Sequence, residues 1–495
     1  MLRGRSLFAS LTLLASAPGA LAGPGDFFGL HVVDEATGRG VPMVTLETTN
    51  GIRQVTDSSG WAAFQEPGLM DRKVFFTVTS PGYAMPKEGF GFAGAGFQVE
   101  QGGTAEIKIL RLNIAERMYR VTGQGLYRDT TLLGREAPLP SPNLFSDVMG
   151  QDSVQALPYR GKLFWMWGDT LRASHPLGNF HTTCATSELP DQGGLHPSLG
   201  VHLKYFLDEK GETVRRMMPP AEPGMMWLDG LVTVPGPDGT EVLLAHYSRM
   251  KDLGTRLEHG IAEFNDEAGI FEPLIRLGEE FKWQCPRGHA ERVKDGDIEY
   301  FYFADPFCHT RVRADYDSLL NPVGYESLVW SEEASAYEWQ SRVAPTSQEE
   351  ETKLVKEKKI PAAKALYQVR NASGGKPVLI HGGTVRWNEH RKRWIMIAVE
   401  HRGDESLLGE VWYAEALAVS GPWGPAVKIA SHPKMSFYNP CQHGFFDQDG
   451  GKTIYFEGTY THTFSGNPEI TPRYEYNQLM YRLDLTDRRL AGAQK

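Results

Sequence analysis

The segment Gly150-Gln-Asp152-Ser-Val-Gln-Ala-Leu-Pro158, followed by Leu163-Phe-Trp-Met-Trp-Gly-Asp169-Thr170, is the clearest strand-turn-strand pattern in the chain. A polar residue beside a small one precedes two apolar runs, Val154–Pro158 and Leu163–Trp167, which a short polar turn separates. Runs of about five residues rich in β-branched and aromatic side chains, joined by a turn, predict a β-hairpin. We therefore expect an antiparallel strand pair with Asp152 at its start and Asp169 at its end.

The same pattern recurs along the chain. The five copies are Gln-Asp152-Ser153, Leu-Asp229-Gly230, Gly-His289-Ala290, His381-Gly-Gly383 and Gln-His443-Gly444. A degenerate repeat of one supersecondary unit is typical of a β-propeller, in which each copy opens one blade. The sequence predicts an all-β protein with a five-bladed propeller over residues 146–490, in which the repeated polar position lines a central funnel.

A smaller domain is expected ahead of the propeller, because 495 residues exceed one ordinary core. Residues 26–113 show short strand-like runs with turn signals about every ten residues, which is the pattern of a β-sandwich. The run from Thr37-Gly38 and Val41-Pro42 to Gly82-Tyr83 resembles the transthyretin-like or carboxypeptidase-regulatory-like domains. Residues 114–145 are expected to form a connector between the two domains.

The first 22 residues have the pattern of a cleaved signal peptide. Arg3 and Arg5 precede a short apolar run, and Ala20-Leu-Ala22 is a small-residue cleavage site. We expect export to the periplasm or the extracellular space. The apolar run is too short for a membrane anchor, and we expect no membrane span elsewhere. A net charge of −10 without a basic stripe argues against nucleic acid as a partner.

Two further features allow alternatives. Cys285 and Cys308 flank one predicted hairpin and are the candidate pair if an exported chain forms a disulfide; the alternative is that they are buried free thiols in separate blades, and the sequence leaves the choice open. The charged insertion at 332–368 is expected to be a solvated helix or loop, and the functional alternative is a lid over the funnel.

Carboxylates are the candidate catalytic groups. Because the second strand of a hairpin ends on the face where the first begins, Asp169 should lie beside Asp152. A carboxylate pair suits glycoside hydrolysis, in which one carboxyl is held protonated and the other stays ionised. Asp229 is the expected third member, which tunes the pKa of a partner or binds sugar hydroxyls. The structural alternative for Asp152 and Asp169 is a turn-capping role, and for Asp229 it is a water-binding role in the central channel.

Several residues near the same positions are candidates for binding substrate. We expect Trp227 and Tyr438 to stack on sugar rings and Arg287 to bind a uronate carboxylate. The remaining substrate-binding candidates are His289, His381, His443 and Glu457. No cofactor is expected to be required, although convergence of the three histidines on a divalent metal in the funnel is an alternative.

The second domain resembles the five-bladed β-propeller glycoside hydrolases, which include furanosidases and endo-acting arabinanases. The resemblance lies in Phe164-Trp-Met-Trp-Gly-Asp169, Gly409-Glu-Val-Trp-Tyr-Ala-Glu415 and Gly421-Pro-Trp423. It implies a base, a pKa modulator and an acid on the first strands of the first three blades. The chain offers Asp152, Asp229 and His289 at these places. Either Asp169, Asp305, Glu400 or Glu457 supplies the acid, or the chemistry differs from that of the family.

Three functions are compatible with these residues. The first is a secreted glycoside hydrolase, acting as a monomer on a polysaccharide or oligosaccharide. The second is a polysaccharide lyase, in which His289 or Tyr438 removes a proton beside a uronate carboxylate that an arginine or a metal neutralises. The third is a propeller that binds glycans without catalysis.

Overall fold

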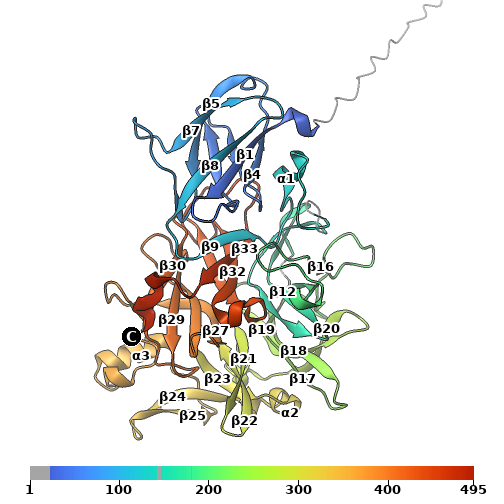
Figure 1. The fold of residues 1–495 in the computed structure, drawn as a ribbon. Helices are drawn as coiled ribbons and strands as arrows, with labels where there is room; N and C mark the ends of the chain where they lie inside the picture. The colour runs from blue at the N-terminus through green and yellow to red at the C-terminus, as the bar shows by residue number, and fades with distance from the viewer. Residues whose placement is uncertain (1–22, 142–145, 180, 495) are drawn as a thin grey trace, which may run out of the picture.

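The structure is a computed structural model that describes residues 23–141, 146–179 and 181–494 (Figure 1). The predicted signal peptide, residues 1–22, lies outside the described residues. Strands dominate the described chain, which confirms the expectation of an all-β protein. The α-helices are short: α1 (Arg128–Leu132), α2 (Tyr316–Leu320) and α3 (Gln348–Lys356).

Two four-stranded sheets near the N-terminus share one apolar core and lie at the top of Figure 1. The first sheet, in spatial order, comprises β4 (Trp61–Phe64), β1 (Phe28–Asp34), β8 (Thr104–Arg111) and β6 (Tyr83–Ala84). The second comprises β3 (Arg53–Val55), β2 (Thr45–Thr48), β5 (Arg72–Thr79) and β7 (Gly94–Val99). In β5, Val74, Phe76 and Val78 are buried and alternate with more exposed residues, which directs one face of the strand into the core.

Five further sheets follow along the chain, and the first three are antiparallel with neighbouring strands in sequence order. The first comprises β11 (Gln155–Tyr159), β12 (Lys162–Trp167), β15 (Thr183–Glu188) and β16 (Lys204–Tyr205). The second comprises β17 (Met225–Pro235), β18 (Glu241–Met250), β19 (Arg256–Asn265) and β20 (Ile270–Arg276). The third comprises β21 (His289–Asp295), β22 (Ile298–Ala304), β23 (Cys308–Arg313), β24 (Glu326–Ser331) and β25 (Ala336–Ser341).

The last two sheets each recruit a strand from elsewhere in the sequence. The fourth comprises β27 (Ile380–Asn388), β28 (Arg393–Glu400), β29 (Glu410–Ala416) and β30 (Pro425–Ser431), with β26 (Arg370–Asn371) parallel to β30. The fifth comprises β31 (Ser436–Gln442), β32 (Thr453–Thr461), β33 (Asn477–Asp484) and β9 (Glu116–Arg120).

The first strands of these five sheets adjoin one another in sequence order, from β11 to β31. Asn439 of β31 donates a hydrogen bond from Nδ2 to Ser153 Oγ at 2.8 Å, just ahead of β11. The first strands therefore form a closed ring. A smaller sheet of β10 (Val148–Gln151), β13 (Thr170–Arg172) and β14 (His175–Asn179) adjoins the β11–β12 hairpin.

Strand β9 lies in the segment 114–145 that the sequence predicts to be a connector. It pairs antiparallel with β33 as the outermost strand of the fifth sheet, so this part of the segment belongs to the ring. Arg120 of β9 is buried, donates to Asn477 Oδ1 at 2.8 Å, and lies 3.8 Å from the ring centre of Tyr474. The connector prediction is therefore wrong for residues 116–120.

The prediction from the fifth copy of the repeat is also wrong. The sequence predicts that His443 opens the last hairpin, but β31 ends at Gln442, and the short helical turns η6 (Gly444–Phe446) and η7 (Asp449–Gly451) follow. Asn439 and Pro440 read as turn residues, whereas the structure accommodates them in an irregularity of the β31–β32 register between Tyr438 and Cys441. In β31, the residues that contact Asp152 and Ser153 are Tyr438 and Asn439, rather than His443.

The charged insertion is not a lid. Helix α3 packs with Trp330 of β24 through Leu354 and Val355. Its Glu351 is buried and accepts hydrogen bonds from the backbone N–H groups of Leu366 and Tyr367 at 2.6 and 2.8 Å. The insertion is therefore a structural element beside the third and fourth sheets.

The four cysteines are buried free thiols, which is the second of the two alternatives that the sequence allows for Cys285 and Cys308. The Cys285 thiol faces the carbonyl oxygens of Tyr247 and Gly260, whereas Cys308 lies in a core cluster with Tyr367. The two thiols belong to different packing environments.

Candidate functional site

Asp152 and Asp169 lie together where the first hairpin passes into β10 and β13. The backbone N–H of Asp169 donates to Asp152 Oδ1 at 2.8 Å, and the N–H of Gly168 donates to the carbonyl of Asp152 at 2.9 Å. A Cβ at Gly168 would stand 2.3 Å from Asp152 Oδ1, so only glycine allows this approach. The strand ends thus fix the two carboxyl groups as neighbours.

Two tyrosines hold the other oxygen of Asp152. Tyr438 and Tyr476 donate from their hydroxyls to Asp152 Oδ2 at 2.8 and 2.6 Å. Burial raises the pKa of Asp152, and the hydrogen bonds from the two tyrosines and from the Asp169 N–H oppose this rise. Hydrogen bonds donated to a carboxylate stabilise its charged form. The contacts favour an ionised Asp152.

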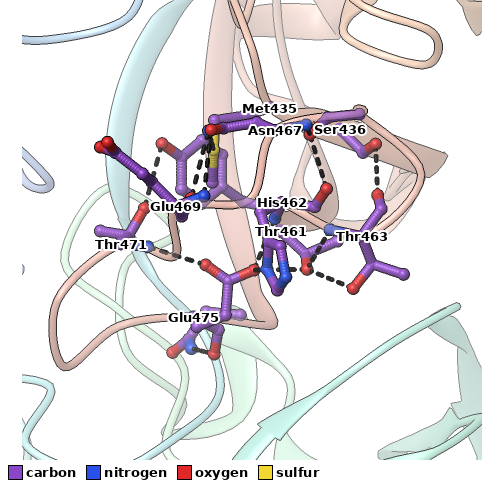
Figure 2. A network of polar contacts seen from close by, with 12 residues as sticks. Met435, Ser436, Thr461, His462, Thr463, Asn467, Glu469, Thr471 and Glu475 are labelled. Atoms are coloured by element: carbon purple, nitrogen blue, oxygen red, sulfur yellow. Dashed lines mark hydrogen bonds and ion pairs between the residues drawn. The ribbon is translucent and has the colours of Figure 1, made fainter.

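Tyr476 belongs to the loop between β32 and β33, which a polar network fixes (Figure 2). Glu475 Oε1 accepts from Thr461 Oγ1, the His462 backbone N–H and His462 Nδ1 at 2.5, 2.5 and 2.9 Å. Its other oxygen accepts from the Thr471 N–H at 3.0 Å. Tyr476 itself has φ 60°, an uncommon conformation for a bulky residue that persists only where neighbours impose it. Glu475 is therefore a positioning residue for Tyr476.

We predict that Glu475→Ala breaks the Tyr476–Asp152 contact. The kcat/KM of a reaction carried out at Asp152 and Asp169 should then fall about 10–100-fold. Tyr476→Phe should have a similar effect, and the double variant should be no worse than the worse single variant, because both remove one interaction. Glu469→Ala is the matched control, since Glu469 lies in the same loop and its side chain is 74% exposed. Additive losses in the double variant would contradict the positioning role.

Asp169 has fewer partners than Asp152. Trp227 of β17 donates from Nε1 to Asp169 Oδ1 at 3.1 Å, and both side chains are partly buried. Burial raises the pKa of Asp169 to about 7, the negative charge of Asp152 adds to the rise, and the Trp227 hydrogen bond opposes it. Two adjacent carboxyls share one proton more readily than they carry two charges. The unequal contacts favour the proton on Asp169.

Asp229 lies in a separate set of contacts. Its Oδ1 accepts from the N–H groups of Gly230 and Gly288 at 2.9 and 2.8 Å and from Gln155 Nε2. Burial raises the pKa of Asp229, and the positive charge of Arg287 opposes the rise. Gly288 has φ 87°, and a Cβ there would meet the Ala304 carbonyl at 2.0 Å. Asp229 therefore fixes the turn that carries Arg287.

Arg287 and His381 are accessible. The Arg287 side chain is 77% exposed, and its Nε lies 3.7 Å from Asp305 Oδ2. Such an exposed pair contributes little to stability, so the guanidinium remains free to bind another anion. His381, also exposed, lies 5.6 Å from His401 between ring centres.

The structure places the other polar candidates inside the protein. His443 and Glu457 are 1% and 0% exposed, and His443 Nε2 lies 2.7 Å from Glu457 Oε1. His289 is buried as well, and its Nδ1 lies 3.5 Å from the Cys441 thiol. His443 contacts Glu457, and both histidines lie beside the Cys441 thiol rather than at an open surface.

Sequence reasoning missed two residues of the site. Tyr476 precedes β33 in an irregular loop, and no periodic pattern connects it to Asp152. Gln155, the second residue after Ser153, binds Asp229 and the Leu231 N–H and so links β11 to β17. The sequence signal that could have identified Gln155 is a polar residue within the predicted strand Val154–Pro158, next to its start.

Among the described residues, no group of three or more His, Cys, Asp or Glu side chains is arranged to hold a metal ion. Within the same part of the chain, no helix has the length and apolar character needed to cross a bilayer.

No protein-family model matches this chain, and no curated protein matches it. Among solved structures, it is similar to a putative exo-β-1,3-galactanase from Bifidobacterium bifidum s17, with 10% identity, a TM-score of 0.37, and coverage of 75% of this chain and 94% of that one. It is also similar to an α-L-arabinanase from Penicillium chrysogenum complexed with arabinobiose, with 12% identity, a TM-score of 0.35, and coverage of 75% and 99%. An exo-1,5-α-L-arabinanase from a bovine ruminal metagenomic library shows 11% identity, a TM-score of 0.35, and coverage of 68% and 94%. At these TM-scores the likeness is too distant to assign a fold family or an activity.

Proposed function

We propose that the chain is a five-bladed β-propeller preceded by a β-sandwich. The ring of five first strands supports the blade count, and β9 closes the last blade with a strand from the start of the domain. The two N-terminal sheets with one shared core support the sandwich.

We propose that this propeller is a glycoside hydrolase that acts on a polysaccharide or oligosaccharide. The observation that carries the proposal is the Asp152–Asp169 pair, in which one carboxyl has both oxygens hydrogen-bonded and the other has a pKa of about 7. Two carboxyls in unequal environments are the requirement for acid–base cleavage of a glycosidic bond.

In the proposed reaction, Asp169 donates its proton to the glycosidic oxygen as the bond from that oxygen to the anomeric carbon breaks. The Asp152 carboxylate stabilises the positive charge that develops on the sugar, and it attacks the anomeric carbon or accepts a proton from the attacking water. Trp227, which donates to Asp169, presents its ring beside the pair as a platform for the sugar. Arg287 binds an acidic group of the substrate farther along the funnel.

A lyase is less well supported. Burial raises the pKa of Tyr438 and of Tyr476 well above the usual tyrosine range, and the charge of Asp152 adds to both shifts. Phenols with such a raised pKa are poor bases, because the phenolate is not populated near neutral pH. His289, the other predicted base, is buried against Cys441.

The test is incubation of the purified protein with a panel of plant, algal and bacterial polysaccharides, with reducing ends and ultraviolet absorbance followed together. Hydrolysis yields reducing ends without new absorbance, whereas a lyase yields unsaturated uronates that absorb. Retention of a glycan without turnover would favour a binding protein and contradict the hydrolase. We also propose that the protein is exported and monomeric, which secretion assays and light scattering would test.

A further inference from the structure

A cavity of about 560 Å³ lies at the end of the ring opposite Asp152 and Asp169. Its walls come from all five first strands, through Leu157, Val232, Glu291, Arg386 and Gln442. Asp152 precedes β11, whereas Leu157 lies at the centre of that strand, so roughly 16 Å of extended chain separates the cavity lining from Asp152. Neither Asp152, Asp169 nor Asp229 lines it.

Buried polar atoms in the cavity wall have no hydrogen-bond partner. The Gln442 side chain is 1% exposed; its Oε1 has no hydrogen-bond partner within the described chain, and its amide lies near the Asp447 carboxyl without forming a contact of hydrogen-bond length. The adjacent Asp447 Oδ1 is likewise buried and unpaired among the described residues. Leaving such groups unsatisfied costs about 1–3 kcal/mol each, so the site favours any ligand that pairs with them.

The charges around the cavity are already paired. Arg386 forms an ion pair with Glu291 and donates to the Ala290 carbonyl at 2.8 Å. Arg292 donates to the Thr233 carbonyl at 2.8 Å and lies 3.3 Å from Glu299. These pairs leave no unopposed arginine for an anionic ligand.

Asp447 does not add a full negative charge either. Burial raises its pKa to about 7, and the nearby Gln442 amide and the positive charge of Arg386 oppose the rise. Near neutral pH a large fraction of Asp447 is therefore protonated, and its carboxyl can both donate and accept a hydrogen bond. The polar part of the cavity thus offers donors and acceptors without excess charge.

Thr233 and Glu389 also line the cavity, and Glu389 is paired with Lys392 and accepts a hydrogen bond from Trp387 Nε1 at 2.8 Å. The remaining lining is apolar. Trp387 is 37% exposed, and Phe301, Phe445, Leu157 and Val232 also line the cavity. A volume in the ~300–1,000 Å³ range with apolar walls and a few convergent polar groups is typical of a small-molecule site. Hydroxyl groups, each both donor and acceptor, match an amide and a partly protonated carboxyl, and sugar rings present apolar faces to aromatic side chains.

We propose that this cavity binds a neutral, hydroxyl-rich small molecule of about disaccharide size, with Gln442 and Asp447 as hydrogen-bonding anchors and Trp387 as an apolar platform. Binding there requires neither Asp152 nor Asp169, so the cavity is a second site and does not rest on the hydrolase activity.

Isothermal titration of the full-length chain with xylobiose, arabinobiose, galactobiose, cellobiose and sorbitol tests this proposal. The titrations use the Asp169→Asn background, which prevents turnover. Gln442→Leu should weaken binding of at least one probe by 10-fold or more, because it removes both amide partners. Trp227→Ala, at the other end of the ring, should leave that binding unchanged.

Gly444→Trp provides an independent block that leaves the anchors in place. Gly444 lines the cavity, its φ lies outside the left-handed region, and a Cβ there meets no atom within 4 Å, so a side chain can enter without displacing the backbone. It should abolish the binding that Gln442→Leu weakens, at an unchanged melting temperature.

The proposal is overturned if no probe binds, or if all binding survives both Gln442→Leu and Gly444→Trp; its loss in Trp227→Ala would then place that binding at the Asp152–Asp169 end. Binding at the cavity in a protein without glycosidase activity would refute only the hydrolase.

Discussion

Asp169→Asn is expected to lower the rate of sugar release by about 10²–10⁴-fold while the protein stays folded, because an amide cannot donate the proton that the leaving oxygen needs. The substitution is close to isosteric and keeps an acceptor for Trp227 Nε1. Reducing-end formation measured under saturating substrate reports the loss in kcat.

Glu400→Gln is the comparator for this experiment. Burial raises the pKa of Glu400 to about 7 as well, but its Oε2 accepts from Trp412 Nε1 at 2.8 Å in the fourth sheet. Glu400→Gln should therefore retain most of the activity. If Glu400→Gln abolished activity and Asp169→Asn did not, Glu400 would be the acid and the assignment of Asp169 would be wrong.

Asp169→Asn should also change the dependence of stability on pH. The folded-state pKa of Asp169 is raised from the usual range to about 7, so the stability that its protonated form provides is present below about pH 4 and is lost as pH rises through 7. Asp169→Asn carries no such charge. It should therefore match the wild type in melting temperature near pH 4 and exceed it near pH 8.

Asp152→Asn is expected to be as damaging as Asp169→Asn, with a loss of about 10²–10⁴-fold in kcat, because it removes the anion that faces the developing positive charge. It has a second consequence. The negative charge of Asp152 contributes to the raised pKa of Asp169, so without it Asp169 loses its proton at a lower pH. The alkaline limb of the residual activity should move toward acidic pH.

A pH–rate profile of the residual activity checks this coupling. In the wild type, activity that depends on protonated Asp169 falls as pH rises through about 7. An unchanged alkaline limb in Asp152→Asn would show that the two carboxyls do not interact. Tyr438→Phe, which removes one donor to Asp152 Oδ2, is the milder comparison and should lower activity without abolishing it.

The first hairpin could be predicted from sequence because its information is local. Val154–Pro158 and Leu163–Trp167 are separated by one turn, and antiparallel pairing alone brings Asp152 to Asp169. The start of the last hairpin was predicted wrongly, because Asn439 and Pro440 are residue types common in turns. Only tertiary packing accommodates them within β31. Tyr476 has no local signal either, since its position depends on the contacts of Glu475 within a loop.

The pairing of β9 with β33 cannot be predicted from local sequence either. It also sets the order in which the sheets can form during synthesis. Arg120 pairs with Leu479, so the fifth sheet cannot be completed until nearly the whole chain has left the ribosome. Contacts between such distant residues form slowly, because a long loop must be ordered before any contact compensates for the lost entropy. The N-terminal sheets consist of residues 28–111 and can be completed far earlier. A nascent chain stopped before residue 479 would carry β9 as an unpaired edge strand. We expect this incomplete chain to be more prone to aggregation than the completed protein.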